Sequence, residues 1–456
     1  MPDPVANLLD KYDRRVPRYT SYPTAPHFSG AVAARDYRQW LAGLDPSAPL
    51  SLYIHVPFCD SLCWFCGCHT KIVRRHQPVA QYLEVLDREI DLAANAMGAR
   101  RDVCHLHFGG GSPSILTPAE VHALFDRLRS RFLILPDADI AIEIDPRDLD
   151  PALIEALAAN GVNRASIGLQ DLNPQVQVAV NRVQTLEETA TAIAALRSHG
   201  VSSINIDLMY GLPHQDEAGV AATVRGALSL APERICLFGY AHVPWMKTHQ
   251  RLIDETALPG PGARFAQYQL AARLLSEAGY TWIGLDHFAR PDDALAVAAR
   301  AGTLRRNFQG YTTDDAIARI GLGPSAIGAL PQGFVQNHTA MNLYRDEIGQ
   351  GELPIARGLA LDEDDRLRGN IIERLMCDLE VDLDRVCREY GHDAAEFADE
   401  LEFLEDMCHD GLVEIERTDT GSVLRITARG RPFVRAASAA FDAYLRPGEV
   451  RHACAV

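Results

Sequence analysis

The sequence predicts an α/β protein: a partial (β/α)6 barrel with an N-terminal arm and a mostly helical C-terminal domain. Short apolar runs alternate with longer helix-like segments between residues 50 and 290, as in βαβ units that build a parallel sheet. Glycine-rich or polar motifs follow these runs, where the loops after parallel strands hold functional residues. We therefore expect four parts: an arm at 1–48, the barrel at 49–290, a barrel extension with active-site residues at 291–355, and the helical domain at 356–456.

The arm comes first, and it contains the segment PRYTSYPTAPHF at 17–28. Its prolines disfavour long regular structure because proline lacks a backbone N–H and fixes one dihedral angle. We expect an irregular segment here that precedes the barrel.

Six apolar runs are expected to form the barrel strands: 51–58, 105–110, 140–145, 164–170, 203–211 and 234–242. Helices are expected between them, for example at 78–96 and at 185–200. The second of these helices opens with Thr185, a residue type that caps helix N-termini, and closes on Gly200.

The C-terminal part changes to helical patterns at 361–380 and 394–411, followed by a possible hairpin at 412–427 and a last helix. Helices with a hairpin could form a winged-helix shape that binds DNA. Residues 361–420 carry 21 Asp and Glu against 6 Arg, however, and this charge would repel phosphate. We expect an acidic lid or support domain.

Composition excludes several classes of protein. A hydrophobic content of 47% supports a large core, and a net charge of −17 argues against a nucleic-acid partner. No apolar targeting segment or run of ~18 apolar residues is present, so we expect a cytoplasmic protein without a membrane span. Isolated cysteines are expected to be small buried residues without a function: Cys104, Cys236, Cys377, Cys387, Cys408 and Cys454.

Four of the ten cysteines lie together in CDSLCWFCGC, directly after the first predicted strand: Cys59, Cys63, Cys66 and Cys68. Three thiolates in a short loop fit a [4Fe–4S] cluster that leaves one iron open to a chelating small molecule. Two alternatives remain open. Nearby histidines (His55, His69 and His76) could complete a zinc site, and Cys63 with Cys66 could form a thioredoxin-like redox pair.

The CxxxCxxC spacing, with an aromatic residue before the third cysteine, resembles the radical S-adenosylmethionine (SAM) superfamily. In that superfamily the open iron chelates SAM, and an electron from the cluster cleaves SAM to a 5′-deoxyadenosyl radical. The segment GGGSPS at 109–114 resembles the glycine-rich segment of the superfamily, where bare backbone can approach SAM.

Nearly the whole chain resembles the oxygen-independent coproporphyrinogen III dehydrogenases, also called oxidases, of haem biosynthesis. The resemblance rests on PRYTSYPTA at 17–25, on Cys68, on GLDHFARPDD at 284–293 and on RNFQGYTT at 306–313. Related haem-trafficking proteins typically lack the arm and the cysteine at the position of Cys68. Both features therefore favour the enzyme over a haem-binding chaperone, which is the second hypothesis; a zinc-stabilised binding module is the third.

The resemblance implies functions for residues throughout the barrel. The cluster ligands would be Cys59, Cys63 and Cys66. The first SAM would lie beside Tyr53, Gly110, Glu143 and Ile327. A second SAM would contact Phe65, Gly111, Ser112, Gln170, Arg182, Asp207 and Ala241, and catalysis would involve Cys68, Phe308 and Gln309.

Without the resemblance, these positions have other readings. The side chains of Tyr53, Phe308 and Ile327 could belong to the core, and Gln170 and Asp207 could cap the following helices. The side chain of Arg182 could be a solvated surface group.

The implied reaction is oxidative decarboxylation of two propionates of coproporphyrinogen III to vinyl groups, which yields protoporphyrinogen IX. Two decarboxylations require two radicals, which would give the second SAM a purpose. An electron donor for the cluster and an external electron acceptor are also implied, and we expect a monomer. The substrate is a tetracarboxylate, so we expect a cationic pocket among Arg14, Arg15, Arg18, Arg290, Arg305 and Arg306, with the arm as a lid.

Overall fold

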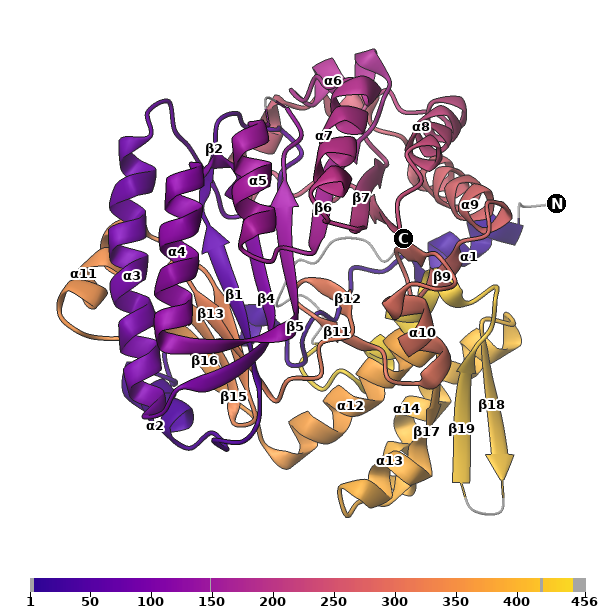
Figure 1. The fold of residues 1–456 in the computed structure, drawn as a ribbon. Helices are drawn as coiled ribbons and strands as arrows, with labels where there is room; N and C mark the ends of the chain where they lie inside the picture. Colours follow the sequence, from indigo (N-terminus) through magenta and orange to yellow (C-terminus); the bar gives the residue numbers. More distant parts are fainter. Residues whose placement is uncertain (1–3, 148, 419–420, 446–456) are drawn as a thin grey trace.

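The structure, a computed structural model, describes residues 4–147, 149–418 and 421–445. Its largest element is a twelve-stranded sheet with the strand order β16-β15-β14-β13-β1-β4-β5-β6-β7-β8-β10-β9 (Figure 1). The six predicted strands are confirmed as the consecutive parallel series β1 (Leu50–Val56), β4 (Arg101–Gly110), β5 (Phe132–Ile144), β6 (Arg164–Gln170), β7 (Ser203–Tyr210) and β8 (Arg234–Gly239).

Additional strands extend this series at both edges. Strand β13 (Ala318–Leu322) pairs parallel with β1, and an antiparallel group continues from it: β14 (Ile327–Leu330), β15 (Gly333–Asn337) and β16 (Ile355–Ala360). At the other edge β10 (His287–Ala289) pairs antiparallel with β8 and with β9 (Thr281–Ile283). The residues at 291–355 thus contribute strands to the same sheet as the barrel.

Helices cover the outer face of the parallel strands, as Figure 1 shows for α3, α4, α5 and α7. Their bounds, in chain order, are α3 (Gln77–Met97), α4 (Pro118–Arg131), α5 (Pro151–Ala159), α6 (Pro174–Ala179), α7 (Leu186–Ser198), α8 (Glu217–Ser229) and α9 (Pro261–Glu277). The predicted cap of α7 is confirmed: the Thr185 side chain accepts a hydrogen bond from the backbone N–H of Glu188. Gly200 follows the helix with a φ of 91°, a left-handed conformation that glycine adopts without strain.

Glu89 on α3 is a carboxylic acid buried in the barrel core, and the residue is 1% exposed. Its carboxyl group accepts hydrogen bonds from the Gly323 N–H (2.7 Å), the Asn337 amide (2.6 Å) and the Tyr344 hydroxyl (2.5 Å). Tyr344 lies on α11 (Met341–Gly349). Glu89 therefore fastens α3 to the segment that extends the sheet. Burial raises the pKa of Glu89 to about 7.

The first half of the arm is anchored in the C-terminal domain. It begins with helix α1 (Pro4–Tyr12), and six apolar side chains from the arm join the hydrophobic cluster of that domain: Leu8, Leu9, Tyr12, Val16, Tyr19 and Tyr22. The guanidinium of Arg435 donates hydrogen bonds to the carbonyl groups of Val16 and Pro17. The segment that we expected to act as a lid is thus packed into a core.

The second half of the arm packs on the barrel. Helix α2 (Ala34–Ala42) contacts α3, and the Phe28 ring stacks on Phe334 of β15 with 5.6 Å between ring centroids. The arm therefore joins the two hydrophobic cores of the molecule.

The C-terminal domain is mostly helical, with α12 (Glu363–Asp378), α13 (Leu383–Glu389), α14 (Ala398–His409) and α15 (Val434–Ser438). The predicted hairpin is confirmed as β18 (Val413–Thr418) and β19 (Gly421–Ile426), with β17 (Glu380–Asp382) on the free side of β19. Helix α10 (Ala294–Ala301) lies between the barrel and this domain (Figure 1). Cys454 lies outside the described residues.

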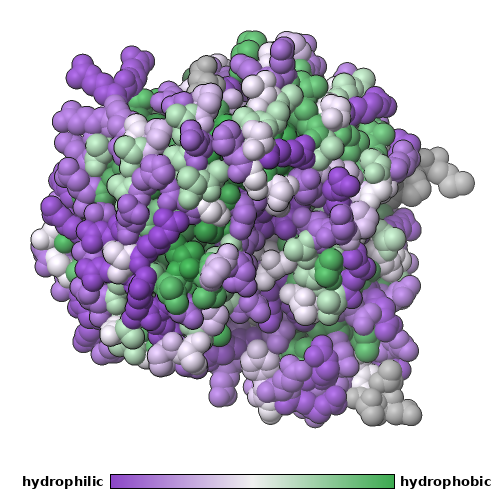
Figure 2. Space-filling view, in the orientation of Figure 1, coloured by the Kyte–Doolittle hydropathy of each residue, from purple (hydrophilic) through white to green (hydrophobic). Residues whose placement is uncertain are grey.

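The face drawn in Figure 2 is mainly hydrophilic, and an apolar patch lies left of its centre. Among the described residues, no helix combines the length and the apolar composition that crossing a membrane requires.

Candidate active site

The parallel strands enclose a cavity of about 260 Å³ inside the barrel. Polar side chains from successive strands line it, and they include His107, Glu143, Ser166, Asn205, Asp207 and His287. Cys68 and Gln309 also line this cavity, from the cysteine loop and from the hairpin of β11 (Arg305–Asn307) and β12 (Gly310–Thr312). Three predicted site residues from distant segments (Cys68, Glu143 and Asp207) thus meet in one space with Gln309.

The cysteine loop follows β1 and is closed by β2 (Phe58–Cys59) and β3 (Lys71–Ile72), which pair in parallel. Three side chains from the segment after β8 hold its carbonyl groups. Lys247 donates to Cys68 O at 3.0 Å, His249 Nε2 lies 2.8 Å from Cys66 O, and Gln250 donates to Phe65 O at 3.1 Å. Sequence reasoning missed these anchors, because nothing in the sequence relates residues 247–250 to a loop about 180 positions earlier.

The three predicted ligands Cys59, Cys63 and Cys66 face one another at this loop. Burial, together with the neighbouring thiols of Cys66 and Cys63, raises the pKa of Cys59 to about 12, while a hydrogen bond with Thr70 opposes this shift. A [4Fe–4S] cluster that leaves one iron open needs three thiolates, and these cysteines supply three from one loop.

Two arginines approach the thiol of Cys63. The Arg182 guanidinium lies 3.5 Å from its sulfur and the Arg147 guanidinium lies 3.9 Å from it. Asp145 orients both, accepting from Arg147 at 2.6 Å and from Arg182 at 3.2 Å. Burial alone would raise the pKa of Asp145, but the hydrogen bond from Arg147 and the charge of Arg182 hold it below its usual value. Positive charge is therefore fixed beside thiols that must be anionic to bind iron.

The position of Arg182 refines its predicted function. The residue is 7% exposed and also donates to the Gly168 carbonyl at 2.6 Å, while its buried Nε has no hydrogen-bond partner. The solvated surface group considered from sequence is therefore excluded. Asp145 and Arg147, which position this charge, were missed as individual residues, although their EIDPR segment follows the third predicted strand.

Residues 110 and 111 must be glycines because the cysteine loop and β1 pack directly against them. A Cβ atom on Gly111 would lie 2.4 Å from the Phe58 carbonyl oxygen, and one on Gly110 would lie 2.6 Å from the His55 ring. Gly110 also has a φ of 111°, which other residues rarely adopt. The next residue, Ser112, donates its N–H to Phe58 O at 2.7 Å. The end of β4 is thus packed directly against the loop that carries the cysteines.

The predicted SAM residues Glu143 and Tyr53 lie beside this segment. Glu143 accepts a hydrogen bond from the Gly110 N–H at 3.1 Å, and its side chain is 41% exposed towards the cavity. The Tyr53 hydroxyl lies 3.0 Å from His55 Nδ1, and burial raises the pKa of Tyr53 well above its usual value. Gly321, the partner of Tyr53 on β13, lies directly against the backbone of Ile327.

The remaining predicted residues are Asp207, Gln170 and Ala241, and they do not all line the same cavity. Asp207 accepts hydrogen bonds from Asn205 (2.8 Å) and Ser166 (3.2 Å), and burial raises the pKa of Asp207 to about 6. Gln170 ends β6 with a φ of 65°, where the register of β6 against β7 shifts. Ala241 lines a different cavity, described below.

The hairpin β11–β12 gives its two predicted residues different surroundings. Gln309 lines the barrel cavity. Phe308 packs edge-on against Phe334, with 6.0 Å between ring centroids, and lies under the guanidinium of Arg319.

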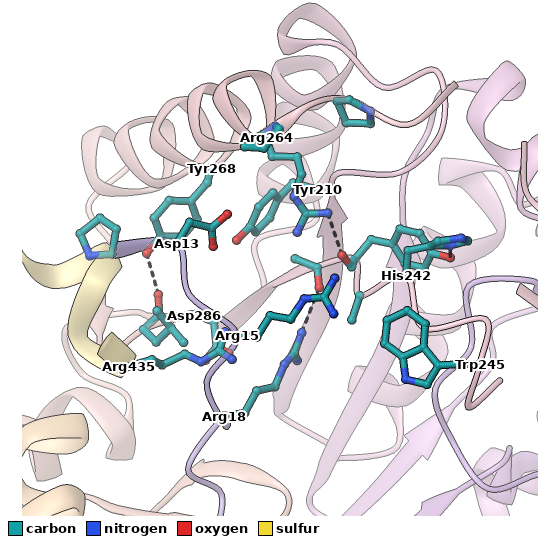
Figure 3. A pocket seen from close by; sticks show the side chains of 17 residues that line it. Asp13, Arg15, Arg18, Tyr210, His242, Trp245, Arg264, Tyr268, Asp286 and Arg435 are labelled. Atoms are coloured by element: carbon teal, nitrogen blue, oxygen red, sulfur yellow. Dashed lines mark hydrogen bonds between the residues drawn. The ribbon is translucent and has the colours of Figure 1, made fainter. Parts of the chain in front are cut away.

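A second cavity, of about 270 Å³, lies where the arm, the barrel and the C-terminal domain meet (Figure 3). Of the six arginines predicted for a cationic pocket, Arg15 and Arg18 line it. The others do not line it: Arg305 pairs with Glu373, Arg290 with Asp292, and Arg14 lies over Phe403. Arg306 is buried over the Tyr311 ring next to the cavity, where it donates to the Arg18 carbonyl at 3.1 Å. Arg264 and Arg435 complete the lining, and the sequence carried no signal for either.

The parallel barrel and its cysteine loop define a radical SAM protein, and residues 53–226 match the model of the radical SAM superfamily. The chain is 49% identical to the oxygen-independent coproporphyrinogen III oxidase of Bradyrhizobium diazoefficiens, over 99% of this chain and 100% of that protein. It is 40% identical to the enzyme of the same name from Escherichia coli K12, over 96% of this chain and 95% of that one. The chain belongs to the family of oxygen-independent coproporphyrinogen III oxidases.

A solved structure supports this assignment across the molecule. The coproporphyrinogen III oxidase of Escherichia coli, described as a radical SAM enzyme, aligns with a TM-score of 0.89 and 39% identity. The alignment covers 95% of this chain and 100% of that one, and therefore extends beyond the barrel into both the arm and the C-terminal domain. The chain is thus a radical SAM oxidoreductase that uses a [4Fe–4S] cluster and SAM.

Proposed function

We propose that this chain decarboxylates two propionate side chains of coproporphyrinogen III to vinyl groups and so forms protoporphyrinogen IX. The observation that carries this proposal is the identity of 49% to a curated coproporphyrinogen III oxidase over essentially the full length of both chains. The cysteine loop and the lined cavity supply the chemistry that such a reaction needs. Because oxygen is not the oxidant, the reaction also requires an electron donor and a separate electron acceptor, and we propose that the chain works as a monomer.

Cys59, Cys63 and Cys66 would hold the [4Fe–4S] cluster. When bound, the cluster and SAM supply a 5′-deoxyadenosyl radical able to abstract hydrogen from a propionate β-carbon. The guanidinium groups of Arg147 and Arg182 offset the negative charge of the thiolates. Apolar contacts keep water away, because Trp64 and Phe65 pack against an apolar cluster behind the loop.

Glu143 and Gly110 would bind SAM where the cavity meets the cysteine loop, together with Tyr53 and Ile327. An exposed carboxylate on a strand end can accept hydrogen bonds from ribose hydroxyls, and Glu143 is the carboxylate that meets this description. A second SAM would be held by the residues already named for it: Phe65, Gly111, Ser112, Gln170, Arg182, Asp207 and Ala241. The polar lining of the barrel cavity at Asp207 supports such a site.

Cys68 is proposed to act without binding iron. Its backbone N–H donates to the Cys66 sulfur at 3.4 Å, and its side chain lines the barrel cavity together with Gln309. This position supports a function for Cys68 in donating hydrogen to the substrate or in orienting it. Phe308 would support Gln309 by fixing the hairpin against Phe334.

The decisive experiment is anaerobic reconstitution with iron and sulfide, followed by incubation with reductant, SAM and coproporphyrinogen III. We expect protoporphyrinogen IX and 5′-deoxyadenosine to form together. Replacing Cys59, Cys63 or Cys66 by Ala should remove the thiolate-to-iron absorption, whereas Cys68→Ala should retain iron and lose product. Stable haem binding without vinyl product would instead identify a haem-binding chaperone, and zinc without iron would identify a binding module.

A further inference from the structure

The second cavity is lined by four guanidinium groups that come from three separate segments. We call it the arginine pocket and define it by Arg15 and Arg18 of the arm, Arg264 of α9 and Arg435 of α15. Two carboxylates also line it, Asp13 and Asp286, and Asp286 already lies 2.8 Å from His287 Nδ1. Figure 3 shows the guanidinium groups converging on one space. In a chain with a net charge of −17, such a concentration of positive charge indicates an anionic ligand.

Main-chain carbonyl groups orient three of these arginines: Arg18, Arg264 and Arg435. Arg18 donates to Gly239 O at 3.0 Å, Arg264 to Tyr240 O at 2.8 Å, and Arg435 to Pro17 O at 2.9 Å. Burial, with the nearby charge of Arg18, lowers the pKa of Arg435 to about 10. These hydrogen bonds fix the geometry of the guanidinium groups before a ligand binds, so little ordering is needed on binding.

The walls of the arginine pocket are flat and apolar. Aromatic rings of Tyr210, Tyr240, Tyr268 and Trp245 line it together with three prolines, and the Arg15 guanidinium lies 5.8 Å from the centre of the Trp245 ring. Flat apolar walls suit pyrrole rings, and guanidinium groups bind carboxylates in a planar, bidentate manner. The lining therefore matches a flat apolar body that carries carboxylates at its edge.

The arginine pocket adjoins the proposed catalytic cavity at two points. Asp286 lines the pocket while the next residue, His287, lines the barrel cavity. At the other end the Gln250 amide donates both to Ala241 O (3.2 Å), on the pocket wall, and to Phe65 O (3.1 Å), in the cysteine loop. The two cavities are therefore neighbours in the fold, next to each other at Asp286 and His287.

We propose that the arginine pocket binds propionate carboxylates of the porphyrinogen that the reaction leaves unchanged, and so selects which propionates face the radical. This inference rests on the proposed function. The pocket is too small for the whole macrocycle, which agrees with its holding one edge while the rest extends into the barrel. The alternative ligand for the arginine pocket is the carboxylate of a second SAM, because Ala241 on the pocket wall was predicted to contact that molecule.

The test uses the reconstituted full-length enzyme with coproporphyrin III, a redox-stable tetracarboxylate, and with its tetramethyl ester. Binding is measured by fluorescence quenching for wild type, Arg264→Gln, Arg15→Gln and the control Arg273→Gln. Arg273 lies on the same helix as Arg264, has a side chain that is 63% exposed and pairs with Glu277 at 3.8 Å. We expect each pocket variant to weaken coproporphyrin binding about tenfold or more, because a charge-assisted hydrogen bond is lost.

Three further results support or overturn the inference. The tetramethyl ester should bind wild type and Arg264→Gln equally, and the control should bind coproporphyrin as wild type does. SAM affinity and 5′-deoxyadenosine formation with reductant alone should not change in Arg264→Gln. Wild-type porphyrin affinity in both pocket variants, or loss of SAM affinity instead, would overturn the inference. Failure of the proposed function would look different, since wild type would then bind the porphyrin without forming the vinyl product.

Discussion

At the residue scale, the side chain of Arg182 connects three parts of the site. It contacts the Cys63 sulfur, pairs with Asp145 at the end of β5 and donates to Gly168 on β6. The sequence predicted that Arg182 belongs to the site only through resemblance, because an arginine in a loop is usually solvated. The contact between Arg182 and Cys63 was not predictable, since 119 positions separate the two residues in the chain. Side-chain contacts between distant loops are set by tertiary packing, which local patterns do not encode.

Replacing Arg182 by Met should lower the reduction potential of the cluster by tens of millivolts while iron content stays the same. Removing a buried cation beside an anionic thiolate makes it harder to add an electron. The measurement is a redox titration followed by electron paramagnetic resonance, and Arg182→Lys should restore most of the potential. An unchanged potential in Arg182→Met would show that this guanidinium does not act on the cluster.

Replacing Glu143 by Gln should weaken SAM binding about tenfold to a hundredfold, because a charged acceptor contributes about 1.5–3 kcal/mol. The amide oxygen can still accept from the Gly110 N–H, so the backbone at the glycine segment should be preserved. Equilibrium dialysis with SAM measures the effect, and the cluster absorption serves as the control. SAM affinity equal to wild type would exclude Glu143 from the ribose site.

At the scale of elements, the parallel strands were predictable and the strands at the edges of the sheet were not. The six consecutive strands stood out because apolar runs alternate with helical patterns and end in polar motifs. Strands β9 and β10 have three residues each and β14 has four, which is too short to show a periodicity. Helix α1 was not predicted from the sequence, for a different reason. The prolines that follow it suggested an irregular arm, although Leu8, Leu9 and Tyr12 form one apolar face.

Helix α3 should make stability depend on pH through Glu89. Burial raises its folded-state pKa from 4.5 to about 7, so the folded chain holds a proton that the unfolded chain releases between these values. The free energy of unfolding should therefore fall as pH rises from about 4.5 to about 7, by on the order of 2–3 kcal/mol from this group. In Glu89→Gln, which does not titrate, the melting temperature should fall less over this range.

The matched control is Glu84→Gln, an exposed position on the same helix. Its melting temperatures should follow those of wild type at every pH. If wild type and Glu89→Gln show the same pH profile, the buried carboxyl group does not titrate in this range.

At the scale of the whole molecule, the arm joins two cores, and this changes what its removal should do. Deleting residues 1–22 should leave the barrel, the cluster ligands and iron content in place, because none of residues 7–22, whose side chains the structure describes, belongs to the barrel core. The C-terminal domain should lose six buried apolar partners, at about 1.5–3 kcal/mol each, and Arg15 and Arg18 leave the arginine pocket.

We therefore expect the deleted chain to show an early unfolding transition in calorimetry and to form 5′-deoxyadenosine without vinyl product. Tyr19→Phe, which removes only the 3.0 Å hydrogen bond to Asp442, is the control for a small local change and should keep most of the product. Full decarboxylation by the deleted chain would show that the arm is dispensable for substrate.

The hydrogen bonds from Arg435 to the carbonyl groups of Val16 and Pro17 also have a consequence for synthesis in the cell. The two sides of this contact are about 419 positions apart in the chain. At about 5–20 residues per second, a ribosome takes about 20–80 s to produce the later side after the earlier one has emerged. For most of that interval the apolar face of α1 lacks the C-terminal domain, which supplies most of the cluster that it joins, although α9 emerges earlier. Nascent chains of this protein should therefore depend on a chaperone that shields their first residues until translation is nearly complete.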